Sequence, residues 1–283
     1  MTVLHTSRKT ADFFRFLLQC APKNDEPNRY FGGLQMNFIE SGAQHDKVIL
    51  LLHGGGLAPW NYVEEAALLQ EKYHILLPVL NGHNSSGCAF TTIEDAACRI
   101  IAFIDEHFDG KVFLIGGLSL GGQILIEMLS QRKNICQYAI IESALVLPMR
   151  ATARLIKPTY ELCYSLIKKR WFARLQFASL HIQPALFEAY FRDSSAISKS
   201  NMTAFLMANA DYKAKPSLAD CNAKLLVLVG EKERKIVKRS AKMICQAVQG
   251  SSLEILPGLY HGDLSINHPA LYVEKVCNLI GEG

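Results

Sequence analysis

A serine between two glycines is the residue in this chain whose setting most favours covalent chemistry. Gly117, Ser119 and Gly121 form a Gly-x-Ser-x-Gly motif, which follows an apolar run at residues 112–115 and precedes a helical pattern at residues 123–129. Glycines at these positions permit a sharp strand-to-helix turn that exposes the serine hydroxyl. The motif therefore predicts a nucleophile, and a purely structural turn is the alternative.

A serine hydroxyl needs a base to remove its proton, and the base needs a carboxylate to orient it. His261 follows the last apolar run, residues 253–256, through a turn-forming stretch that contains proline and glycine. This position at the end of a strand makes His261 the predicted base. Asp263 and His268 are nearby but fit less well, because His268 directly precedes Pro269 and belongs to the cap of the last helix.

The acid is predicted among glutamates that follow apolar runs. Glu233 comes shortly after residues 225–229, and the chain between it and His261 has room for one helix and one strand. Glu233 is therefore the predicted acid. Glu231 and Glu142 stay open as competitors, and the alternative for the pair after residues 225–229 is that they bind neighbouring basic side chains at the surface.

Attack on a carbonyl creates an oxyanion, which must be stabilised by correctly aimed N–H groups. A His-Gly loop, which consists of His53 and three glycines at residues 54–56, directly follows the apolar run at residues 48–52. We expect the N–H of Gly55, helped by that of Gly56, to act together with the N–H of Leu120. The Leu120 donor also begins a helix, whose positive dipole end favours an anion.

Apolar runs alternate with helical patterns along the chain. Strands are expected at residues 48–52, 75–79, 112–115, 138–141, 225–229 and 253–256, and helices at residues 61–70, 93–104, 120–131, 235–249 and 269–279. Strands this apolar suit a parallel sheet that is covered on both faces. The fold class is therefore α/β, with a mostly parallel, doubly wound sheet. Thr91 and Glu94 have the spacing of a capping box for the second of these helices.

Residues 145–221 interrupt the alternation, because they contain helical patterns and no convincing strand. Helices are expected there at residues 155–167, 169–180, 184–191 and 202–209. The chain is therefore divided into an α/β core, residues 1–144 and 222–283, and an inserted helical cap, residues 145–221. Most large side chains of the cap should bury it against the core, while some line an apolar acyl or aromatic pocket. These side chains are Tyr160, Tyr164, Trp171, Phe172, Phe177, Phe187, Tyr190, Phe191 and Phe205.

The serine turn, the His-Gly loop and the order serine, acid, histidine resemble the α/β-hydrolase superfamily over roughly residues 34–280. Within it, the chain is similar to serine hydrolases with a helical cap, such as bacterial carboxylesterases. Residues 81–86 resemble the family turn Asp-x-x-Gly-His-Gly-x-Ser, but Val79 stands where aspartate is common and Asn84 where glycine is. The superfamily permits aspartate or glutamate as the acid, which accommodates Glu233.

Two further histidines, His53 and His83, lie in these family turns, and structural roles are expected for both. A zinc site made of His53, His83 and His261 lacks the close-spaced ligand pairs of known zinc motifs. No metal and no cofactor is therefore expected.

The resemblance implies hydrolysis of a small or medium apolar ester, thioester or lactone through an acyl-enzyme. Acyl transfer, amide cleavage and carbon–carbon bond hydrolysis use the same residues and stay open, as does a non-catalytic ligand-binding protein on this fold. Epoxide and haloalkane hydrolysis are disfavoured, because the relatives that perform them carry aspartate where this chain has Ser119. Nucleotide binding is disfavoured because the glycine motif matches neither the dinucleotide fingerprint nor the P-loop.

The composition limits the classes of binding partner and the cellular compartment that we expect for the protein. The chain has 283 residues, of which 49% are hydrophobic and 20% charged, and its net charge of +4 comes from basic clusters interrupted by other residues, which disfavours nucleic-acid binding. Eight cysteines without a Cys-x-x-Cys spacing predict reduced thiols and a cytoplasmic protein.

The apolar stretch near the start is too short for a signal peptide or a membrane span, although residues 8–19 have the pattern of an amphipathic surface helix. The oligomeric state stays open, with a homodimer among the options.

Overall fold

The computed structural model describes residues 36–83 and 86–282. The predicted surface helix at residues 8–19 lies outside the described residues, and so does Asn84 of the turn at residues 81–86. Among the described residues, no helix is both long and apolar enough to cross a membrane.

A seven-stranded sheet with the order β1-β3-β2-β4-β5-β6-β7 forms the centre of the molecule. Its strands are β1 (Phe38–Ser41), β2 (Val48–Leu52), β3 (His74–Pro78), β4 (Val112–Leu118), β5 (Cys136–Glu142), β6 (Lys224–Gly230) and β7 (Ser252–Leu256). Only β1 is antiparallel to its neighbour, and the other paired strands run parallel. The mostly parallel α/β fold predicted from the sequence is thus confirmed.

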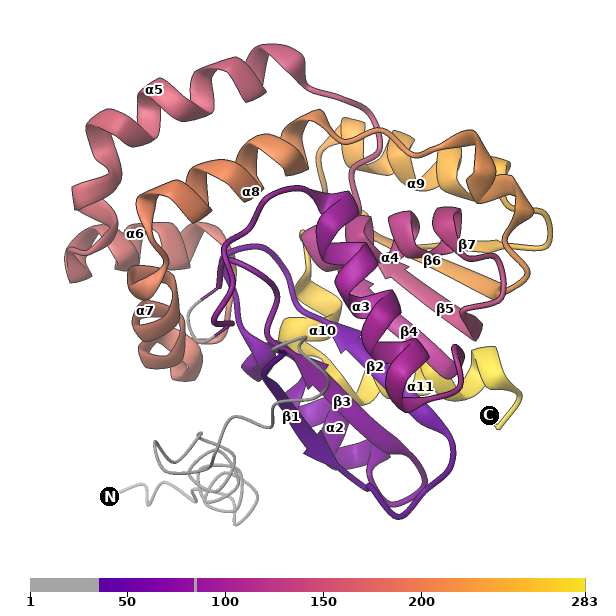
Figure 1. Cartoon of the computed structure of the whole chain (residues 1–283). Helices are drawn as coiled ribbons and strands as arrows, with labels where there is room; N and C mark the ends of the chain where they lie inside the picture. Colours follow the sequence, from indigo (N-terminus) through magenta and orange to yellow (C-terminus); the bar gives the residue numbers. More distant parts are fainter. Residues whose placement is uncertain (1–35, 84–85, 283) are drawn as a thin grey trace, which may run out of the picture.

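Helices cover both faces of the sheet, with α3, α4 and α9 on one face and α2 and α11 on the other (Figure 1). The helices of this part are η1 (Pro59–Tyr62), α2 (Val63–Leu69), α3 (Ile93–His107), α4 (Leu120–Gln131), α9 (Lys235–Ala247), α10 (Asp263–Asn267) and α11 (Pro269–Ile280). Successive side chains of a strand point to opposite faces. In β2, Leu50 joins the core under the first group of helices, while Ile49 and Leu51 join the core under the second. A strand buried on both sides must be apolar throughout, which explains the continuous runs in the sequence.

Residues 145–221, which we call the helical segment, connect β5 to β6 and contain no strand. The segment consists of α5 (Arg150–Ile167), α6 (Arg170–Ser179), η2 (Pro184–Leu186), α7 (Phe187–Ala196), α8 (Lys199–Asp211) and η3 (Pro216–Asp220). Helices α5 to α8 lie together beyond one end of the sheet, at the upper left of Figure 1. Met202 and Phe205 of α8 join the core between the sheet and α3 and α4, so the segment is packed onto the rest of the fold.

Three local features differ from the expectation. Strand β1 and the short helix α10 were not predicted. The capping-box prediction was wrong by one residue, because the N-cap of α3 is Thr92, whose hydroxyl oxygen accepts the N–H of Asp95. Thr91 instead donates its hydroxyl to the Asp95 side chain.

The turn at Ser119 is possible because Gly117 and Gly121, two residues away on either side, have no Cβ atom. Ser119 has φ 52° and ψ −107°, a conformation that is costly for a residue with a Cβ atom. A Cβ on Gly117 would lie 2.5 Å from the carbonyl oxygen of Gly121, and a Cβ on Gly121 would lie 2.1 Å from that of Leu52. The two glycines of the motif therefore let α4 start directly against β2 and β4.

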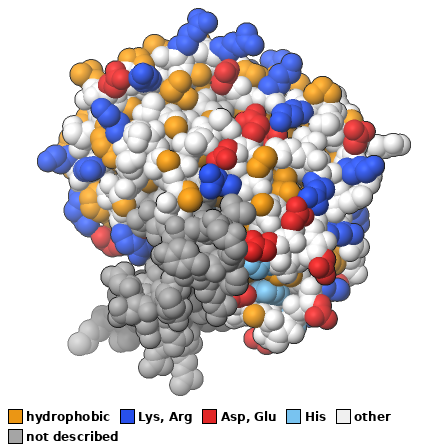
Figure 2. All heavy atoms as spheres, in the orientation of Figure 1, with side chains coloured by type: hydrophobic (Ala, Val, Ile, Leu, Met, Phe, Trp, Pro, Cys, Tyr) orange, Lys and Arg blue, Asp and Glu red, His pale blue; other side chains and the backbone are white. Residues whose placement is uncertain are grey.

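The surface carries both signs of charge. On the face shown in Figure 2, acidic side chains lie among basic ones, and basic side chains are most frequent around the upper rim. Among the described residues visible on this face, basic side chains do not form a continuous stripe of the kind that nucleic acids bind.

We predict that Gly121→Ala destabilises the protein far more than Gly122→Ala, although both replace a glycine in the first turn of α4. The added Cβ at Gly121 would overlap the Leu52 carbonyl, whereas at Gly122 it would lie 3.0 Å from the Gly117 carbonyl. Overpacking against backbone should lower the free energy of unfolding by about 3 kcal/mol. Urea unfolding of both variants measures the difference, and equal stability would contradict this account of the turn.

Candidate active site

The predicted nucleophile, base and acid meet at the carboxyl ends of three parallel strands. Ser119 follows β4, Glu233 follows β6 and His261 follows β7. The Nε2 atom of His261 is 3.1 Å from the Oγ of Ser119, and its Nδ1 atom is 2.8 Å from the Oε2 of Glu233. With the proton on Nδ1 donated to the carboxylate, Nε2 is free to accept the serine proton.

Both oxygen atoms of the Glu233 carboxylate accept hydrogen bonds. Its side chain has no exposed surface, whereas the side chain of His261 is 48% exposed. The Oε1 atom of Glu233 accepts the hydroxyl of Ser143 at 2.6 Å and the N–H of Gly230 at 2.9 Å. The imidazole ring, which is open to solvent, is therefore oriented by a buried carboxylate that cannot easily move.

Ser143, which the sequence analysis missed, links the acid to the histidine loop. It has a positive φ of 58° directly after β5, and its Oγ atom accepts the N–H of Gly262 at 3.3 Å while donating to Glu233. The carbonyl oxygen of the preceding residue, Glu142, accepts the N–H of Ser119 at 2.8 Å. The signal in the sequence was a polar residue directly after a buried strand. Such a residue lies at the same edge of the sheet as Ser119, because both follow the carboxyl ends of parallel strands.

The two competing acids make other contacts. The Oε2 of Glu231 accepts the N–H of Gly258. The Oε1 of Glu142 accepts the N–H of Ser265 at 3.4 Å, and its Oε2 has no hydrogen-bond partner among the described residues. Neither carboxyl contacts the ring of His261, which binds Glu233.

The pKa of Glu142 is raised to about 7, mainly by burial and also by the charge of nearby Glu233, while hydrogen bonds from Ser265 and the charge of His261 oppose the shift. On its other sides, Glu142 faces a buried polar cluster of Glu65, Tyr62 and Tyr272. Burial also raises the pKa of Glu65 well above its usual value. Burial therefore disfavours the charged form of both carboxyl groups, and at a pKa of about 7 Glu142 is about half ionised at neutral pH.

The two expected oxyanion donors lie next to one another. A Cβ placed on Gly55 would be 3.4 Å from the Cβ of Leu120, so the loop after β2 touches the start of α4. Among the described residues, neither N–H group has a hydrogen-bond partner. Gly56 differs from the expectation, because its N–H donates to Nε2 of His83 at 2.9 Å and is not available to an oxyanion.

His53 and His83 are buried, neutral rings that form hydrogen bonds with this loop. His53 accepts the N–H of Leu80 at Nε2, and its Nδ1 lies 2.9 Å from the carbonyl oxygen of Gly54. Burial lowers the pKa of both histidines, that of His83 to about 4. Neutral rings can accept N–H groups at Nε2, as both do here. No cluster of three or more metal-binding side chains is found in the described part of the chain.

A narrow cavity of about 120 Å³ lies between the loop after β2 and the helical segment. Gly55, Gly56 and Leu57 line one side, and side chains from α5 to α8 line the other. Of the aromatic side chains predicted to line a pocket, three do so, namely Tyr160, Tyr190 and Phe205. Trp171 instead is 59% exposed.

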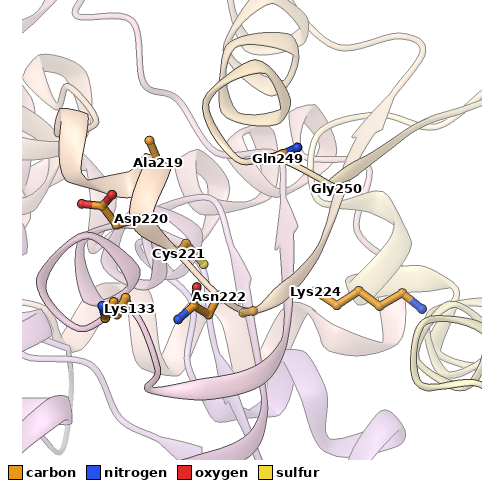
Figure 3. Close-up of a pocket in the computed structure, with 9 residues that line it drawn as sticks. Lys133, Ala219, Asp220, Cys221, Asn222, Lys224, Gln249 and Gly250 are labelled. Atoms are coloured by element: carbon orange, nitrogen blue, oxygen red, sulfur yellow. The ribbon is translucent and has the colours of Figure 1, made fainter.

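A larger hollow of about 680 Å³ lies at the opposite edge of the sheet (Figure 3). It is lined by Lys133, Asp220, Asn222 and Lys224, among others, near the starts of β5 and β6. Because Ser119 and His261 follow the carboxyl ends of their strands, this hollow does not belong to the candidate active site.

Solved structures of three enzymes share the fold at low sequence identity. A thermophilic esterase from Thermogutta terrifontis has a TM-score of 0.73 and 15% identity, covering 90% of this chain and 96% of its own. The enol-lactonase from Burkholderia xenovorans LB400 has a TM-score of 0.76 and 14% identity, covering 90% of this chain and 100% of its own. The bromoperoxidase from Bacillus anthracis has a TM-score of 0.75 and 13% identity, covering 87% and 95%. Identities this low show a shared fold and do not carry a substrate across.

A comparison with curated proteins gave no match. The model of the Alpha/beta hydrolase family matches residues 49–275. This range contains β3 to β7, all of β2 except Val48, the serine turn, Glu233 and His261, so the match extends over the whole candidate site. The chain therefore belongs to the alpha/beta hydrolase family, as its motifs predict.

Proposed function

We propose that the protein is a serine hydrolase that cleaves carboxylic ester-like bonds. The observation that carries the proposal is the ring of His261, which contacts Ser119 Oγ through one nitrogen and the buried Glu233 through the other. This is the arrangement that activates a serine hydroxyl. Membership of the alpha/beta hydrolase family supports a hydrolase.

In the proposed reaction, the Oγ of Ser119 attacks the carbonyl carbon while its proton moves to Nε2 of His261. The carbonyl oxygen becomes an oxyanion that accepts the N–H groups of Gly55 and Leu120, and the start of α4 adds its positive dipole end. The intermediate collapses when the bond to the leaving group breaks and His261 returns the proton to that group. Water then attacks the acyl-enzyme by the same steps and releases the acid and Ser119.

Glu233 is the proposed acid, because it contacts His261 and its second oxygen is held by Ser143 and Gly230. A negative charge beside the ring stabilises the imidazolium that forms when Ser119 loses its proton. A neutral Glu142 would supply no such charge.

The proposed substrate is a small or medium apolar ester, thioester or lactone, and the helical segment acts as the cap over it. The cavity beside Gly55 supports this, since Leu57, Ile167, Met202 and Phe205 contribute apolar side chains to a lining that also has polar groups. The seven free cysteines of the described residues support a reducing, cytoplasmic setting.

Ser119→Ala is predicted to lower the hydrolysis of p-nitrophenyl butyrate at least about 10³-fold and to abolish labelling by a fluorophosphonate probe. The thermal transition should stay nearly unchanged, because the variant loses only a hydroxyl. Ser130→Ala, which removes a hydroxyl bound within the same helix α4, is the control and should keep full activity. An active Ser119→Ala enzyme would remove Ser119 from the mechanism, and wild-type protein that gives no adduct would favour a non-catalytic binding protein.

Glu233→Gln is predicted to lower kcat by about 10³- to 10⁴-fold, because an amide cannot stabilise the imidazolium and can favour the wrong tautomer. Glu142→Gln should change kcat less than about threefold, because Gln resembles the neutral carboxyl that burial favours there. Steady-state kinetics of the two variants distinguish the acids. The opposite order of effects would assign the role to Glu142.

A pH dependence of stability is predicted from Glu142. Its pKa is about 7 in the folded protein and near 4.5 when unfolded, so between these values the folded state binds more protons and loses stability as the pH rises. Glu142→Gln removes this loss. The variant's free energy of unfolding, relative to wild type, should therefore increase between pH 5 and pH 8 by an amount on the order of 2 kcal/mol. Urea unfolding at both pH values provides the test, and a constant difference would show that Glu142 ionises normally.

A further inference from the structure

Helices α5 and α6 expose a cluster of large apolar side chains. Eight large apolar side chains are exposed among the described residues, and five of these lie within residues 155–180. Four of the five, which we call the outer apolar residues, have exposed fractions between 59% and 83%, namely Leu155 and Leu162 of α5 and Trp171 and Leu175 of α6. Single exposed apolar residues are normal, but a cluster of them indicates contact with another molecule.

On α5, the two exposed leucines lie beside a row of basic side chains. Leu155 and Leu162 are seven residues apart, about two helical turns, and therefore share one side of the helix. Three basic residues at spacings of four and three share a second side, namely Arg150, Arg154 and Lys157. The buried residues of α5, Ala153 and Ile167, lie on the third side. A surface that approached α5 from outside would therefore meet leucines and basic groups together.

Helix α6 has one apolar outer side and another side that faces the cavity beside Gly55. Trp171 and Leu175 are four residues apart and share the outer side. Gln176 and Leu180, which line the cavity, are also four residues apart and lie on a different side. The outer surface and the cavity are therefore separated by a single helix.

The charge around the outer apolar residues is strongly positive. Residues 150–180 contain seven Lys or Arg residues and one acidic residue, Glu161. Of the seven, Arg170 forms an ion pair with Glu188, and the other six form none with a described residue. Basic and apolar side chains lie next to one another at the upper left of Figure 2, where α5 runs in Figure 1.

Positive charge alone does not distinguish this surface, because residues 232–242 are basic as well. On the helix of that region, α9, Met243 is the one large apolar side chain that is exposed. In the described part of the chain, a basic excess therefore coincides with several exposed apolar side chains on α5 and α6 alone.

The charge of this surface selects its partner. Residues 1–35, which lie outside the described residues, contain five Lys or Arg and three Asp or Glu and so are themselves basic. A second copy that docked by the same face would bring the two basic rows together. A nucleic acid would bind the basic row but leave Leu162 and Trp171 in water. A membrane with anionic headgroups matches both features, because Leu and Trp enter the boundary of headgroups and acyl chains while Lys and Arg bind phosphates.

We propose that the outer face of α5 and α6 binds the surface of a membrane that contains anionic phospholipids. The outer apolar residues insert among the headgroups, and the basic row of α5 binds lipid phosphates. This binding is a property of the surface and does not depend on the proposed hydrolysis.

The test measures cosedimentation of the full-length protein with vesicles of phosphatidylcholine alone or of an equal mixture of phosphatidylcholine and phosphatidylglycerol. At low salt, the wild type should bind the anionic vesicles at least about tenfold more tightly, and about 0.5 M NaCl should remove most of this difference. Leu162→Ser/Trp171→Ser should bind the anionic vesicles about tenfold less tightly than the wild type. Leu68→Ser, which changes a 53% exposed leucine on α2, is the matched control and should bind as the wild type does.

A second pair of variants separates this surface from the overall charge of the protein. Arg154→Gln/Lys157→Gln should weaken binding to the anionic vesicles roughly tenfold. Lys111→Gln/Lys133→Gln removes the same charge beside the starts of β4 and β5, at the opposite edge of the sheet, and should change binding less than about twofold. All these side chains are exposed or partly exposed, so thermal transitions should stay at the wild-type temperature and show that the variants are folded.

Equal binding of the wild type to both kinds of vesicle would overturn the proposal. Binding to neither would also overturn it and would leave an acidic protein as the partner that fits the surface. Wild-type binding by both Leu162→Ser/Trp171→Ser and Arg154→Gln/Lys157→Gln would be equally decisive, because the contact would then belong to another part of the chain, such as residues 8–19.

Discussion

The hydrogen bond between His261 and Glu233 is the interaction on which the candidate site depends. An imidazole can accept the serine proton at Nε2 only when Nδ1 carries a proton, and the carboxylate at 2.8 Å favours that form. Glu233 can do this because it is buried and its other oxygen is bound by Ser143 and Gly230. The buried hydrogen bonds of Glu233 thus fix the orientation of the exposed His261 ring.

Burial disfavours the charged forms of several polar groups around the site. His53 and His83 are buried rings with lowered pKa values, and they accept backbone N–H groups from the loops that follow β2 and β3. The carboxyl groups of Glu142 and Glu65 have raised pKa values for the same reason, which is burial. Burial therefore weakens the competition of these groups with Glu233 for the ring of His261, and an oxyanion at Gly55 and Leu120 would meet N–H donors.

The sequence was sufficient to predict the structure where a pattern was local, and it was insufficient where a contact joined distant loops. The largely buried strands β2 to β6 could be predicted because burial on both faces requires continuous apolar residues, and the partly exposed β7 still has enough apolar residues to be identified. Strand β1 has the sequence Phe-Ile-Glu-Ser at the edge of the sheet, with a pattern too short and too mixed to identify. Ser143 acquires its role only when the turn after β5 meets Glu233 and Gly262. Likewise, Glu142 and Glu233 both follow apolar runs, and only the folded arrangement of β5, β6 and β7 separates the one that contacts His261 from the one that does not.

The helical segment leaves the core after β5 and returns at β6, and none of Ser119, Glu233 and His261 belongs to it. It nevertheless contributes most of the side chains around the cavity beside Gly55. Under the proposed function, the bond-breaking groups lie on both sides of this segment in the sequence, with Ser119 before it and Glu233 and His261 after it, while one continuous stretch supplies most of the groups that would contact the molecule to be cleaved. Substitutions within residues 145–221 would then change which molecule fits without moving Ser119, Glu233 and His261 relative to one another.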